Sequence, residues 1–195
     1  MSTANFETRA QRLSAAQIAR LLGACLLAFG VFLSGFVISE PAPYELVMVI
    51  QIAIWFLLGL RISRTVCLLL ALLMVFNIGG MFSITVMKDM SGAPMYIAVS
   101  TFLALSSVFY AAIIEDDPGR FELIFRVWVV AAIITALLGI LGYFNAFPGA
   151  HMFTRYDRAM GAFQDPNVFG PYLIAPILYM LYRLLTGRIM EAPFL

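Results

Sequence analysis

The residues best suited to chemistry lie close together in the stretch RYDRAMGAFQDPN, which runs from Arg155 to Asn167. Two arginines three residues apart offer planar forks of N–H donors that match the oxygens of a phosphate or diphosphate. Further along the stretch, Asp165 followed by Pro166 is typical of a helix start, and the free N–H groups of a helix start favour an anion. The pattern predicts an anion site that needs no metal.

A purely structural interpretation of the same stretch stays open beside the chemical one. Asp165 and Asn167 are suited to cap the helix and shape the loop, while Gly161 supplies a turn. The two arginines, Arg155 and Arg158, are also suited to bind phosphates of lipid headgroups at the membrane surface. On this interpretation the stretch anchors a helix and takes no substrate.

The side chains that titrate or bind metals are few. His151 is the only histidine, and it or Asp157 is a candidate to deprotonate an acceptor hydroxyl, although a solvated loop position is the simpler interpretation. The two cysteines, Cys25 and Cys67, lie in separate apolar runs, where we expect small buried apolar residues and no disulfide. No metalloprotease, zinc-ribbon or P-loop motif is present in the sequence, and we expect neither a metal nor another cofactor.

The surrounding chain is strongly apolar. Hydrophobic residues make up 63% of the 195 positions and charged residues only 12%, which is about half the charged share of an ordinary soluble domain. A net charge of +1 provides no basic field for nucleic acid. The composition therefore predicts an integral membrane protein.

Six apolar stretches have the length that a membrane-crossing helix needs, roughly 17 to 25 residues. We expect a single integral membrane domain over residues 1–195, an all-α bundle of about six spans. The loop between the fifth and sixth spans, residues 148–167, contains the arginine stretch and is the longest connection. The expected spans are 21–39, 44–60, 65–87, 95–114, 127–147 and 168–186.

The positions of the basic residues predict the orientation of these spans. With both termini in the cytoplasm, nine basic residues lie inside and three outside, as the positive-inside rule favours. The loop 148–167 then lies on the outer face, where two arginines go against the rule. The inner residues are Arg9, Arg12, Arg20, Arg61, Arg64, Arg120, Arg126, Arg183 and Arg188, and the outer ones are Lys88, Arg155 and Arg158.

The run RAMGAFQDPNVFGPYL, from Arg158 to Leu173, resembles a segment that recurs in the O-antigen ligase and O-antigen or exopolysaccharide polymerase family of bacterial membrane proteins. In that family the segment likewise closes an outer-face loop and opens a transmembrane helix. The resemblance covers about sixteen residues, and the other five spans carry no signature of their own. The matching positions are Arg158, Gly161, Phe163, Asp165, Pro166, Asn167, Tyr172 and Leu173.

The resemblance implies a glycosyltransferase of lipopolysaccharide or exopolysaccharide biosynthesis in the bacterial inner membrane. Its substrate would be a glycan carried on a polyprenyl diphosphate at the periplasmic face, and other polysaccharide-assembly proteins would be partners. Arg158 is then the first candidate to stabilise charge on the departing diphosphate, and Arg155 the second. His151, Asp157 and Asn167 are further candidates to contact the substrate.

Family members have more spans and a second, larger outer loop. The resemblance therefore covers the N-terminal half of such a protein, and we expect this chain to be a short form, a truncated product or one part of a split enzyme, incomplete and inactive alone. Two alternatives stay open. One is a transporter or flippase for a lipid-linked or anionic substrate, and the other is a non-catalytic membrane subunit.

Overall fold

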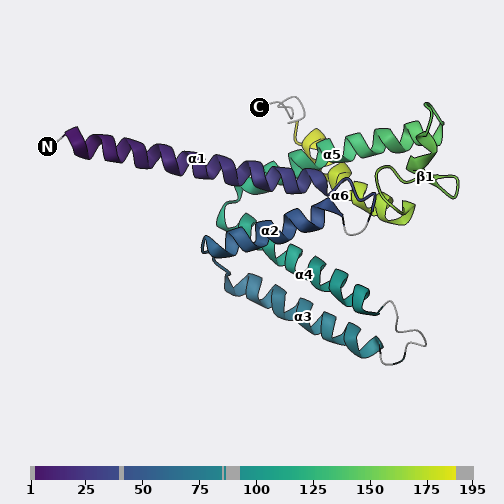
Figure 1. The fold of residues 1–195 in the computed structure, drawn as a ribbon, viewed down its shortest axis with the longest axis horizontal. Coiled ribbons are helices and arrows are strands. Elements are labelled where there is room, and N and C mark those ends of the chain that lie inside the picture. Colours follow the sequence, from purple (N-terminus) through teal and green to yellow (C-terminus); the bar gives the residue numbers. More distant parts are fainter. Residues whose placement is uncertain (1–2, 40–41, 85, 87–92, 188–195) are drawn as a thin grey trace. The chain divides into compact units, whose positions relative to one another are not determined.

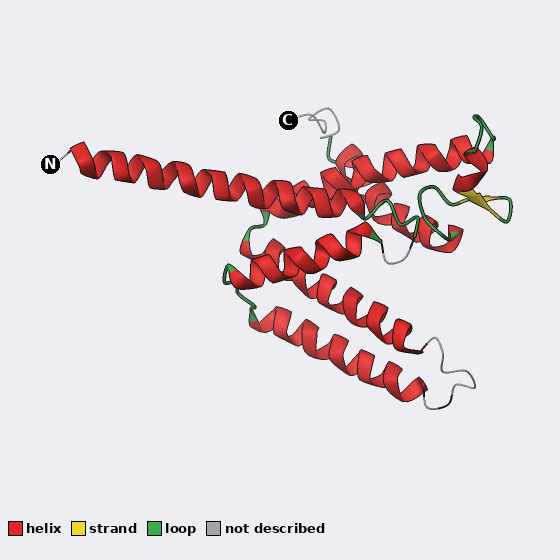
Figure 2. Cartoon of the chain, in the orientation of Figure 1, coloured by secondary structure: helices red, strands yellow, loops and turns green. Residues whose placement is uncertain are grey.

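The computed structural model describes residues 3–39, 42–84, 86 and 93–187 (Figure 1). Within them, helices dominate, and the only strands form a small hairpin ahead of the last helix (Figure 2). The α-helices are α1 (Thr3–Leu33), α2 (Pro43–Leu57), α3 (Arg64–Ile84), α4 (Ala93–Asp116), α5 (Gly119–Tyr143) and α6 (Pro166–Leu185), and the shorter elements are the 3-10 helix η1 (Ala150–Phe153) and the strands β1 (Thr154–Arg155) and β2 (Arg158–Ala159).

The predicted all-α fold is confirmed in its coarse form. Four helices, α3 to α6, are long and apolar enough to cross a membrane, which indicates a membrane protein. The apolar part of α1, Gln17–Leu33, and α2 are shorter. The 15 residues of α2 extend about 22 Å at 1.5 Å per residue, less than the ~30 Å hydrocarbon core of a bilayer. Six spans and the orientation of the termini therefore remain predictions, and Lys88 and Arg188 lie outside the described residues.

The chain divides into two compact units, Met1–Gln51 with Glu122–Leu195, and Ile52–Phe121. In the first unit, a polar contact joins α1 to α2. The side chain of Gln51 is fully buried, and its amide donates a hydrogen bond to the carbonyl of Leu26. A Cβ added at Gly30 would lie 2.3 Å from Nε2 of Gln51, so only glycine leaves room for this contact. This contact is an interhelical hydrogen bond, which gives the amide N–H of Gln51 a partner in an apolar bundle.

A second polar contact in this unit joins α5 to α6. One carboxylate oxygen of Glu122 accepts hydrogen bonds from Nε of Arg126 at 2.9 Å and from Nη1 of Arg183 at 2.5 Å. Beside it, the rings of Phe125 and Tyr179 stack at 5.0 Å between centroids. The first turn of α5 is thus joined to the last turn of α6. The carboxylate of Glu122 balances the charge of Arg183.

In the second unit, α3 and α4 pack side by side (Figure 1). Val66 of α3 and the α4 residues Val108 and Ala112 form a small buried cluster. The ring of Trp55 lies edge-on to that of Phe109, at 5.8 Å between centroids. Away from α4, helix α3 exposes apolar side chains such as Leu72, Val75 and Phe76. This is the kind of surface that lipid covers.

The polar side chain of Asn77 bonds within its own helix, and the expectation for the two cysteines differs from the structure. The Asn77 amide donates to the carbonyl of Leu73, four residues earlier in α3. Cys25 and Cys67 are free thiols and both are exposed on the helix surface, not buried. A sequence reveals that a residue lies in an apolar helix, but the helix face it occupies depends on the neighbours that pack there.

Replacing Glu122 by alanine is expected to destabilise the protein by about 1 to 3 kcal/mol, because two guanidinium groups between α5 and α6 lose their shared acceptor. Thermal unfolding in detergent measures this as a lower Tm. The matched control is Glu115→Ala, which removes an exposed carboxylate near the end of α4. Equal Tm values for the two variants would show that the ion pairs contribute no net stability.

Candidate functional site

The loop between α5 and α6, residues 144–165 and here named the α5–α6 loop, folds back along one face of α5. Helix α5 ends at Tyr143, and Asn145, with φ at 49°, turns the chain. A Cβ added at Gly142 would lie 2.7 Å from Cβ of Phe153 and 2.9 Å from the carbonyl oxygen of Ala150. The backbone of the loop therefore lies against the last turn of α5, where glycine leaves space for it.

The middle of the loop is a tight hairpin. Strand β1 pairs antiparallel with β2, and Arg155 faces Arg158 directly across the pair. The two residues of the turn, Tyr156 and Asp157, have φ values of 54° and 55°. Positive φ at both turn residues is the geometry of a type I′ turn, which glycine and asparagine usually occupy. A tyrosine in this conformation costs about 1 to 2 kcal/mol, so the rest of the loop must hold the turn.

The returning chain, Gly161 to Phe163, is fixed by a buried side chain of α5. Thr135 is fully buried, and its hydroxyl oxygen accepts a hydrogen bond of 2.8 Å from the backbone N–H of Ala162. The carbonyl of Ala162 in turn accepts 2.8 Å from the N–H of Val37, just after α1. Gly161 has φ of +57°, and a Cβ there would lie 2.6 Å from the carbonyl oxygen of Thr135.

These contacts place the returning chain beside α5, well before the C-terminal end of that helix. Thr135, Gly139 and Gly142 are spaced four and three residues apart and share one helix face. Thr135 precedes the end of α5 at Tyr143 by eight residues, which is about 12 Å along the axis at 1.5 Å per residue. Irregular backbone at that depth needs partners inside the protein, and Ala162 has one for each of its backbone groups.

Helix α6 begins as the sequence predicts. The carboxylate of Asp165 accepts a hydrogen bond of 2.7 Å from the N–H of Asn167, and Pro166 occupies the first turn. Phe163, just before the cap, is buried, and its ring contacts those of Phe169 and Tyr172 at 5.9 and 4.9 Å. The motif residues around the cap therefore form a packed helix start.

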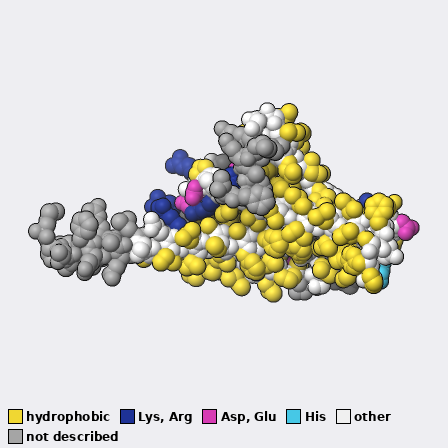
Figure 3. All heavy atoms as spheres, turned by 90° about the horizontal axis from the view of Figure 1, so that it is seen from above, with side chains coloured by type: hydrophobic (Ala, Val, Ile, Leu, Met, Phe, Trp, Pro, Cys, Tyr) yellow, Lys and Arg dark blue, Asp and Glu magenta, His cyan; other side chains and the backbone are white. Residues whose placement is uncertain are grey.

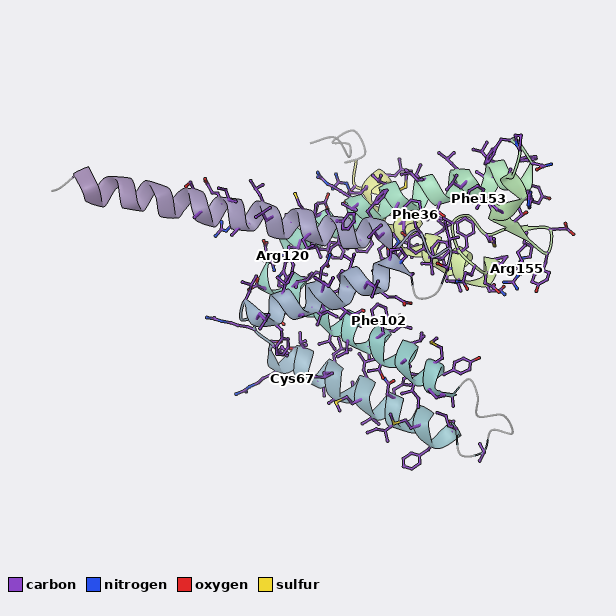
Figure 4. All side chains as sticks on the ribbon, in the orientation of Figure 1. Phe36, Cys67, Phe102, Arg120, Phe153 and Arg155 are labelled. Atoms are coloured by element: carbon purple, nitrogen blue, oxygen red, sulfur yellow. The ribbon has the colours of Figure 1, made fainter. Side chains whose placement is uncertain are left out.

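Both arginines of the hairpin reach toward this helix start, and Figure 4 labels Arg155 on the loop. Nη1 of Arg155 donates to the carbonyl oxygen of Gln164 at 2.9 Å, and its guanidinium lies 5.1 Å from the centre of the Tyr156 ring. Nη1 of Arg158 donates to Oδ1 of Asn167 at 3.1 Å. The structure thus brings Arg155, Arg158 and Asn167 together, three of the residues selected from the sequence.

The electrostatics of this group are unbalanced. Cross-strand partners have Cβ atoms about 5 Å apart, and two like charges at such positions repel each other. Among the described residues, neither guanidinium has a carboxylate within ion-pair distance, and the acceptors of both are neutral oxygens. Each guanidinium carries five donors, of which one is used here. The pair can therefore bind an oxyanion through several charge-assisted hydrogen bonds.

No hydrogen bond or ion pair among the described residues joins the remaining candidates, His151 and Asp157, to the two guanidinium groups. His151 lies exposed in η1, and the backbone carbonyl of His151 accepts from the hydroxyl of Thr154. Asp157 is exposed in the hairpin turn and forms no ion pair with the flanking arginines. Within the part of the chain that the structure describes, no group of three His, Cys, Asp or Glu side chains has the arrangement of a metal site.

The sequence interpretation missed Thr135 and the hairpin. Thr135 is one β-hydroxy residue in an apolar helix, which sequence alone does not distinguish from a packing residue. The hairpin lacks the Asn-Gly or Asp-Gly turn by which short hairpins are recognised.

The sequence matches no protein-family model, curated protein or solved structure.

Replacing Gly161 by alanine is expected to destabilise the loop by about 2 kcal/mol or more, because φ is left-handed and the new Cβ meets the backbone of Thr135. Thermal unfolding in detergent and proteolysis of the loop both measure the effect. Gly170→Ala is the matched control, since a Cβ there has open space. Equal protease resistance of the two variants would contradict the placement of Gly161 against α5.

Replacing Thr135 by valine keeps the shape of the side chain and removes the acceptor of the Ala162 N–H. A buried donor without a partner costs about 1 to 3 kcal/mol, so the Tm is expected to fall. Thr135→Ser retains the hydroxyl and should keep most of the stability. A valine variant as stable as wild type would show that the methyl group and not the hydrogen bond holds the loop.

Proposed function

We propose that the chain is part of a membrane glycosyltransferase of bacterial surface polysaccharide biosynthesis, similar to O-antigen ligases and polymerases. Its substrate is a glycan carried on a polyprenyl diphosphate, and the α5–α6 loop binds the diphosphate at the periplasmic face of the inner membrane. The observation that carries the proposal is the cross-strand pair of Arg155 and Arg158, whose guanidinium groups have neutral acceptors and lie beside the start of α6.

The chemistry of such a transfer suits the arginine pair. When a sugar leaves a lipid diphosphate, negative charge develops on the departing phosphate, and preorganised cationic donors lower the free energy of that transition state. Arg158 acts directly on the phosphate, and Arg155 provides a second contact. The N-terminal N–H groups of α6 add a positive electrostatic potential at the same place. No metal is needed for this role.

The other motif residues support the arginines. Asn167 positions Arg158 by accepting its hydrogen bond, while the Asp165 cap and Pro166 define where α6 begins. The acceptor sugar would be deprotonated by His151 or Asp157, both exposed and therefore accessible to it. A further loop from another part of the enzyme, or from a partner protein, would complete the site.

The topology that goes with this function has both termini in the cytoplasm. The basic residues near the termini, at the connection between α2 and α3 and in the first turns of α5 then lie inside, and the arginine pair lies outside. Two arginines on the outer face have no topological advantage, and binding of an anion gives a physical reason for their presence there.

The test is complementation of a deletion strain with wild type, Arg158→Ala or Arg61→Ala, followed by separation of surface glycolipids on a gel. We expect Arg158→Ala to lose the polysaccharide, since removal of one such donor costs about 100-fold or more in rate. Arg158→Lys should recover little, because an ammonium cannot form the bidentate contact.

Arg61→Ala is the matched control, because Arg61 is an exposed arginine in the connection between α2 and α3, far along the chain from the loop. All variants must be equally abundant in the membrane. An unchanged glycan profile on deletion, or full activity of Arg158→Ala, would overturn the proposal and favour a transporter or a non-catalytic subunit.

A further inference from the structure

The α5–α6 loop and the last residue of α5 expose several large apolar side chains. Tyr156 at the hairpin tip is 76% exposed and Phe144 at the start of the loop is 74% exposed. Tyr143, Phe147 and Met152 are also exposed. In Figure 3, the end of the molecule that carries the histidine shows hydrophobic side chains beside basic and acidic ones. Five large apolar side chains within fourteen residues are therefore exposed on this part of the surface.

Part of the loop lies beside the helix that precedes it. Its returning chain contacts α5 at Gly139 and at Thr135, about 12 Å before the end of that helix. Helix α5 is long and apolar enough to cross a membrane, so its last turns lie near the bilayer surface. The returning chain at Gly161 and Ala162 therefore lies beside the last turns of α5 and not beyond them.

Bilayer lipid fits this surface better than a protein does. Phe144 follows the exposed α5 residues Leu137, Ile140 and Leu141 at helical spacing, so its side chain continues their apolar surface. Tyrosine and arginine are the residues that favour the membrane interface, since each combines an apolar body with a polar end. Arg155 lies over the ring of Tyr156 at 5.1 Å, and its charge complements the phosphates of the headgroup layer.

We propose that the α5–α6 loop lies in the headgroup layer of the adjacent leaflet, with its exposed aromatic side chains in contact with phospholipid. The arginine pair then lies at the depth of the lipid phosphates, and a phosphate attached to a lipid reaches it by lateral diffusion within the leaflet. The proposal concerns the phospholipid bilayer itself and does not depend on the glycosyltransferase activity.

The test places an environment-sensitive fluorophore on single cysteines in nanodiscs that hold one chain each. Native Cys25 and Cys67 are first replaced by alanine. The probe goes on Tyr156→Cys or Met152→Cys in the loop, on Leu137→Cys as the lipid-exposed reference and on Glu115→Cys as the aqueous reference. Quenching is then measured with brominated phospholipid and, separately, with aqueous iodide.

We expect both loop probes to emit at shorter wavelength than the Glu115 probe, to be quenched by brominated lipid, and to be quenched several-fold less by iodide. Using two loop positions keeps the test valid if one variant fails to insert. Iodide quenching equal to that of the Glu115 probe would overturn the proposal, as would protection that appears only in discs containing two copies. These readouts need no glycan substrate, so their failure is distinct from failure of the proposed activity.

Discussion

The position of Ala162 is the constraint on which the rest of the α5–α6 loop depends. Its N–H donates to Thr135 of α5, and its carbonyl accepts from Val37, just after α1. In an apolar environment a backbone group without a partner costs several kcal/mol, so these two hydrogen bonds are required wherever irregular backbone lies among helices. They connect three distant segments of the first unit and determine where the chain between α5 and α6 returns.

The hairpin and the start of α6 follow from that constraint. With Gly161 and Ala162 held against α5, the chain from Phe144 to Met160 must leave the end of α5 and return to its side, and the hairpin closes within this stretch. Its turn places Tyr156 and Asp157 in the left-handed region. The hairpin also opposes two like charges, so local preferences alone disfavour it. The hydrogen bonds of Arg155 to Gln164 and of Arg158 to Asn167 connect the hairpin to the start of α6 and help to maintain this geometry.

Polar side chains also join the helices of the first unit. Gln51 of α2 bonds to α1, and Glu122 of α5 bonds to Arg183 of α6. Between Phe163 at the helix start and Tyr179, a row of ring contacts passes through Tyr172, Trp128 and Phe125. These ring contacts pack α6 against α5 from its first turns to near its end.

The sequence by itself determined the membrane character, the helical fold and the cap at Asp165, because hydropathy, helix length and capping are local properties of neighbouring residues. It also identified the stretch that contains the arginines. Only the tertiary structure decided that Arg155 faces Arg158, that both reach the start of α6, and that Thr135 holds the loop against α5. These features join residues far apart in the chain or depend on an atypical turn, and no local pattern encodes such contacts.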